Sequence, residues 1–112
     1  YQTGWEILKA NRDNAMMMNA IAWYTLDDAA VTDRDYEFAM AAAKAAEAAS
    51  GGTNPAILDT LARAYYEMGD FDMAVKVQKK AVEKAGDDAM GESIRTQLEK
   101  YEAAAKAGRK TA

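Results

Sequence analysis

The chain has 112 residues, half of them hydrophobic, and a formal net charge of −4 at pH 7. It contains no cysteine and no histidine, which excludes disulfides and thiolate chemistry and removes the commonest general base and metal ligand. The acidic balance argues against a nucleic-acid or anionic-membrane partner. The length predicts a single domain, 1–112, and its many alanines predict helices, because alanine is the best intrinsic helix former.

The first half of the sequence predicts three helices. Thr3 and Glu6 form a capping box at the start of a short helix over residues 3–10. A second helix is expected from residue 14 to about residue 26, because apolar residues recur there at spacings of three and four. After an acidic connection, the alanine-rich segment 34–50 predicts a third helix, which ends at a pair of glycines.

The second half predicts three more helices. Asn54 and Pro55 form a start signal, with asparagine as N-cap and proline in the first turn, and this helix is expected to close at Gly69. The next helix covers residues 71–85 and the last covers 88–107, and we expect the tail 109–112 to fray. The chain begins without methionine, so we expect it to be a fragment or processed product of a longer protein.

The sequence contains two copies of a helix–turn–helix unit, residues 14–50 and 54–85. The third and fifth helices match at an offset of 35 residues, and the second and fourth match at an offset of 40. The aligned pairs include Tyr36 with Phe71, Ala39 with Ala74, Ala46 with Ala81, Met18 with Leu58 and Ala22 with Ala62. Self-similarity at such a period is typical of a helical solenoid, in which small residues let neighbouring helices approach closely.

The second copy carries the pattern of a known repeat family. It reads Leu58-x-x-Leu61-Ala62-x-x-Tyr65-x-x-x-Gly69-x-Phe71-x-x-Ala74 and is followed by Ala81. This pattern resembles the tetratricopeptide repeat (TPR). The first copy departs from it, because Thr25 stands where the tyrosine is expected and the turn glycine is missing. The resemblance implies an all-α fold, a short α-solenoid of two TPR-like repeats with an N-terminal helix and a C-terminal capping helix.

A second resemblance concerns the context of the domain. Residues 19–23, 58–65 and 74–81 are similar to the TPR-like C-terminal regions attached to bacterial thioredoxin-like proteins. This resemblance implies a parent protein with a further domain onto which the helices could dock.

The TPR resemblance also implies a binding surface, because in that family the first helix of each pair lines the concave face where peptides bind. The corresponding residues are Asn19, Trp23, Leu26, Asp59, Arg63 and Tyr66. Tryptophan, tyrosine and arginine are the types enriched at binding hot spots. Two simpler interpretations stay open. Asp59 and Arg63 are four residues apart and could form only a surface ion pair, and Trp23 could be a core residue beneath the N-terminal helix.

Other features are assigned to structure rather than to chemistry. We expect the run Met16-Met17-Met18 to place two residues in the core and one at its rim, because consecutive helical residues point in different directions. The acidic connection between residues 27 and 37 lacks the glycine and ligand spacing of an EF-hand loop, so no metal site is expected. No nucleophile, base and orienting third group occur together, so we expect neither catalysis nor a cofactor.

The sequence therefore predicts a non-catalytic TPR-like scaffold that binds a protein or peptide partner. The alternative is structural docking, either onto another domain of the parent protein or onto a second copy as a homodimer. No nucleic-acid or membrane partner is expected. The compartment stays open, because nothing in the sequence separates a cytoplasmic from an exported bacterial protein.

Overall fold

The computed structural model describes residue 6, residues 14–27 and residues 33–111, and no strand occurs among them. Five helices follow one another: α2 (Ala15–Asp27), α3 (Asp33–Ser50), α4 (Pro55–Glu67), α5 (Phe71–Lys84) and α6 (Ala89–Thr111). The all-α prediction is confirmed for these residues. Glu6 is helical, and the rest of the helix expected over residues 3–10 lies outside the described residues.

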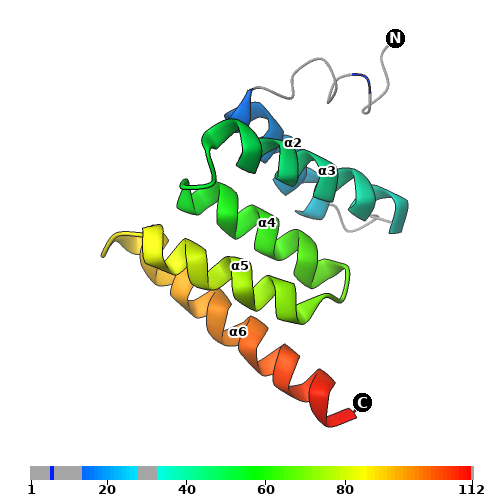
Figure 1. Ribbon diagram of the computed structural model, residues 1–112, viewed down its shortest axis with the longest axis vertical. Coiled ribbons are helices and arrows are strands. Elements are labelled where there is room, and N and C mark those ends of the chain that lie inside the picture. The colour runs from blue at the N-terminus through cyan, green and yellow to red at the C-terminus, as the bar shows by residue number, and fades with distance from the viewer. Residues whose placement is uncertain (1–5, 7–13, 28–32, 112) are drawn as a thin grey trace.

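The helices lie side by side in chain order, from α2 to α6 (Figure 1). Each helix packs on the next one in sequence, and α4 also contacts both α2 and α6. Alternate helices α2, α4 and α6 therefore meet along one side of the row. This packing brings residues that are far apart in the sequence to a common surface.

Side-chain caps and left-handed glycines define the turn regions around α4. The Asn54 side chain accepts hydrogen bonds from the backbone N–H groups of Ala56 and Ile57, at 2.9 and 3.3 Å, which confirms it as the N-cap of α4. Asp70 caps α5 in the same way. Between the two helices Gly69 has a φ of +83°, a conformation that glycine adopts without a Cβ clash. The turn from α4 to α5 is therefore short, as expected.

Alanines occupy buried positions that the two aligned copies share. The matched small positions of the two copies have no exposed area: Ala22, Ala39, Ala46, Ala62, Ala74 and Ala81. The matched large pair Met18 and Leu58 is also fully buried. Because burial agrees at these aligned positions, the two copies turn equivalent faces toward the core.

The methionine run departs from expectation. The face of α2 that packs inward carries Met18, Ala22 and Leu26, at a spacing of four residues. Met16 and Met17 lie off this stripe and are 64% and 40% exposed. The expectation of two core methionines is therefore wrong, because only Met18 is in register with the buried face.

The last helix closes the row and is longer than expected. α6 packs on α5 and α4 and buries Ile94, Tyr101 and Ala105. It continues to Thr111, beyond the expected end at residue 107. Gly108 does not interrupt the helix, and it lies close to the ring of Phe71 at the start of α5.

None of the described helices combines the length and the apolar character needed to cross a bilayer.

Candidate functional site

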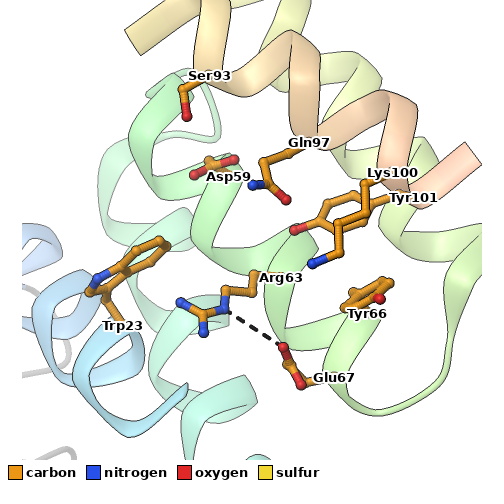
Figure 2. Close-up of a pocket in the computed structure, with 9 residues that line it drawn as sticks. All are labelled: Trp23, Asp59, Arg63, Tyr66, Glu67, Ser93, Gln97, Lys100 and Tyr101. Carbon is orange, nitrogen blue, oxygen red and sulfur yellow. Dashed lines mark ion pairs between the residues drawn. The ribbon is translucent and has the colours of Figure 1, made fainter. Parts of the chain in front are cut away.

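A pocket of about 220 Å³ opens between α2, α4 and α6. Its lining residues are Trp23 from α2, Asp59, Arg63, Tyr66 and Glu67 from α4, and Ser93, Gln97, Lys100 and Tyr101 from α6. Figure 2 shows the α4 residues in the middle, with Trp23 on one side and the α6 residues on the other. The pocket is therefore built by three helices, and its lining combines charged groups with aromatic rings.

Four of the six residues expected in a binding groove line this pocket: Trp23, Asp59, Arg63 and Tyr66. The other two do not. Leu26 belongs to the buried stripe of α2 and lies in the core. Asn19 is half-buried, and its side-chain oxygen is buried without a hydrogen-bond partner in the described part of the chain.

Arg63 connects α4 to the C-terminal end of α2. Its Nη1 donates to Asp27 Oδ1 at 2.8 Å, and its Nη2 donates to the Leu26 carbonyl at 3.2 Å. Its Nε also lies 3.8 Å from a carboxylate oxygen of Glu67, one turn along α4. The guanidinium group thus satisfies a helix-end carbonyl and two carboxylates at once.

Trp23 forms the α2 side of the pocket. Its ring lies 4.7 Å from the guanidinium carbon of Arg63, within the range of a cation–π contact. The side chain is 37% exposed, which does not fit the simpler interpretation of a core residue. The indole is therefore positioned by Arg63 and still reaches solvent at the pocket.

Asp59 is held from the side of α5. Gln78 is fully buried, and its Nε2 donates to Asp59 Oδ1 at 2.8 Å and to the Ile94 carbonyl at 2.9 Å. Burial raises the pKa of Asp59 above its ordinary value, and the hydrogen bond from Gln78 and the charge of Arg63 oppose that rise. Arg63 makes its ion pairs with other carboxylates, so the simpler interpretation of an Asp59–Arg63 ion pair is not found among the described residues.

An aromatic cluster forms the α6 side of the pocket. The ring of Tyr66 stacks on Tyr101 with centroids 4.9 Å apart, and it contacts Phe71 at 5.4 Å. Lys100 Nζ lies 4.9 Å from the centre of the Tyr66 ring. Burial raises the pKa of Tyr101 well above its ordinary value, and the charge of Asp59 adds to the rise. The Tyr101 hydroxyl therefore remains protonated and able to donate a hydrogen bond.

The contribution of α6 is the part of the pocket that sequence reasoning missed. The four lining residues Ser93, Gln97, Lys100 and Tyr101 follow one another at helical spacing and share one face. The three polar members, Ser93, Gln97 and Lys100, were visible in the sequence beside the apolar residues Ile94 and Tyr101 of the same helix. Their orientation toward α4 was not visible, because it depends on how α6 packs on α5.

Comparisons with family models, with curated proteins and with solved structures give no significant match to this chain. The chemistry of the pocket therefore rests on its own residues. In the part of the chain that the structure describes, no group of three or more Asp, Glu, His or Cys side chains could hold a metal ion. The lining offers carboxylates, cations, hydroxyls and aromatic faces, which are groups suited to recognising a polar ligand.

Proposed function

We propose that this chain is a non-catalytic TPR-like scaffold domain that binds a peptide segment of a protein partner in the pocket between α2, α4 and α6. The observation that carries the proposal is the convergence of Trp23, Asp59, Arg63 and Tyr66 on one open pocket. These residues come from two helices, and they are joined there by residues of a third. Tryptophan, tyrosine and arginine side chains held by packing are the groups that dominate binding energy at protein interfaces.

The packing order supports the repeat interpretation. In stacked helical pairs, the first helix of each pair lies along one face of the stack. Here α2 contacts α4, and α4 contacts α6, in addition to the contacts between sequential helices. The two matched copies also bury equivalent alanines. A short stack of this kind forms a concave face from α2, α4 and α6, and the pocket lies between these three helices.

A steric block of the pocket tests the proposal. Ser93 is exposed and lines the pocket on α6, and its replacement by tyrosine would fill part of the space without removing a core contact. Thr96 is exposed on the same helix outside the lining, so Thr96→Tyr is the matched control. Peptides selected from a random display library on the unmodified chain should lose binding to Ser93→Tyr and retain it on Thr96→Tyr. Equal binding to both variants, or failure to select any peptide, would contradict the proposal.

A second candidate function is structural docking, and the exposed face of α2 favours it. Met17 and Tyr24 are 40% and 74% exposed and lie seven residues apart, on the same face of the helix. Such a face could pack on a second copy or on another domain of the parent protein, such as a thioredoxin-like one. Sedimentation equilibrium distinguishes these cases. A homodimer that Tyr24→Ser dissociates supports self-association, and a monomer at all concentrations contradicts it.

A further inference from the structure

Of the two carboxylates that line the pocket, Asp59 and Glu67, only that of Asp59 has no ion pair among the described residues. One of its oxygens accepts from Gln78 at 2.8 Å, and the other has no hydrogen-bond partner among the described residues. No cation in the described part of the chain forms an ion pair with it, because Arg63 is bound to Asp27 and Glu67. A largely buried carboxylate without a cation gains more from a new ionic partner than a fully hydrated one would.

From this arrangement we infer that the pocket selects peptides by a cationic side chain, a lysine or an arginine, which pairs with Asp59. The inference rests on the proposed function and names the class of ligand.

The size of the pocket agrees with this inference. At about 220 Å³ the space is smaller than the roughly 300–1,000 Å³ of typical small-molecule sites, and it suits one extended side chain rather than a cofactor.

The charge around the pocket also favours a cation. Three carboxylates, Asp27, Asp59 and Glu67, lie at or beside the pocket, against the two cations Arg63 and Lys100. Arg63 is held by its bonds to the end of α2 and does not turn toward Asp59. Gln78 fixes the orientation of Asp59 from behind, so the free oxygen is already positioned for a donor.

Lys100 is the group that would support the opposite preference, for an anionic ligand. It forms no ion pair among the described residues, and its ammonium group lies over the Tyr66 ring, 4.9 Å from the ring centre. Lys100 is exposed on a flexible stem, so its ammonium group stays hydrated and can move away from an incoming cation. Asp59 cannot do the same. Removing the charge of Asp59 should therefore weaken the binding of a cationic peptide, and removing the charge of Lys100 should strengthen it.

The probes are synthetic seven-residue peptides with acetylated and amidated ends, whose central residue is lysine, arginine, glutamine or glutamate and whose other positions are mixtures of uncharged residues. Binding is measured by the fluorescence of labelled peptides. We expect the lysine and arginine sets to bind at least about tenfold more tightly than the glutamine set. Asp59→Asn keeps an acceptor for Gln78 and should abolish this preference, whereas the matched control Asp87→Asn, in the exposed turn before α6, should not.

Lys100→Gln supplies the second, independent variant, because an exposed residue of α6 can be changed without risk to the fold. It should tighten binding of the lysine and arginine sets by about two- to fivefold, because it removes a positive charge that repels the cationic side chain of the peptide. Preference for the glutamate set, weakened by Lys100→Gln, would overturn the inference and leave the proposed function intact. Equal binding of all four sets would do the same. Binding that Ser93→Tyr does not reduce, or no binding of any set, would overturn the proposed function itself.

Discussion

Replacing Ala62 by leucine is the sharpest test of how closely the helices approach one another. Ala62 lies on α4, which contacts all four other described helices, and it has no exposed area. Leucine adds three heavy atoms at a position where the neighbouring helices leave no open surface. The added atoms can be accommodated only if a helix moves or a side chain leaves its preferred rotamer.

Overpacking of this kind costs about 1–3 kcal/mol in well-packed cores. An unfolding entropy of about 2.1 cal/mol/K per residue gives about 0.24 kcal/mol/K for a chain of 112 residues. The expected loss of thermal stability is therefore a decrease in Tm of about 4–13 °C. The same argument applies to Ala22, its partner in the alignment of the two copies, which is equally buried.

The measurement is thermal unfolding followed by circular dichroism at 222 nm. Ala103→Leu is the matched control, because Ala103 is exposed on α6 and the same atoms would be added in solvent. The control should leave Tm nearly unchanged, since surface substitutions usually fall within about 0.5 kcal/mol of zero. A Tm of Ala62→Leu within about 2 °C of the unmodified chain would refute the reasoning, because it would mean that the crossing has unused room.

Three further predictions follow from single contacts. Gly91→Ala should lower stability by about 1–3 kcal/mol in thermal unfolding, because a Cβ there would meet the Gly86 carbonyl. Within a helix, a change from glycine to alanine usually increases stability, so a raised Tm would contradict this prediction. Arg63→Lys should cost about 1 kcal/mol in urea unfolding and speed amide exchange at the end of α2, since lysine cannot reach both Asp27 and the adjacent carbonyl. Burial raises the pKa of Asp59 in the folded chain. The stabilisation that comes from the protonated carboxyl is therefore fully present below about pH 4, and the free energy of unfolding decreases as pH rises through the folded-state pKa. Asp59→Asn should therefore gain stability relative to the unmodified chain between pH 4 and pH 7, and a difference independent of pH would refute the assigned cause.

The ends of α4 and the burial of the matched alanines could be predicted because local rules decide them. Asn54 caps α4 with its own side chain, and Gly69 adopts a backbone conformation that other residues avoid. The alanines recur at the spacing that places them on one face, and packing buries that face in both copies. These features depend on residues within about two turns of one another, a range in which sequence patterns are informative.

The contacts of the pocket could be predicted only in part, because they depend on long-range packing. Arg63 has a carboxylate one turn away in each direction, Asp59 and Glu67, and local spacing does not choose between them. The structure adds a third partner, Asp27, which is 36 residues away in the sequence. Gln78 is a comparable case. A glutamine on the fifth helix gave no signal, yet its burial lets it hold Asp59 in place.

The last helix determines both how the helical row is closed and what the pocket contains. Ile94 and Tyr101 are buried where α6 packs on α5 and α4, and the neighbouring turns present Ser93, Gln97 and Lys100 to the pocket. Without α6, the remaining helices would expose the apolar face of α5, and Asp59 and Tyr66 would lie on an open surface rather than in a pocket. A helix that only capped the core would need polar residues facing solvent, but it would not need a hydroxyl, an amide and an ammonium group aligned opposite α4. Because one helix serves both purposes, substitutions on its buried side should change stability and ligand binding together, whereas those at Ser93 and Lys100 should change binding alone.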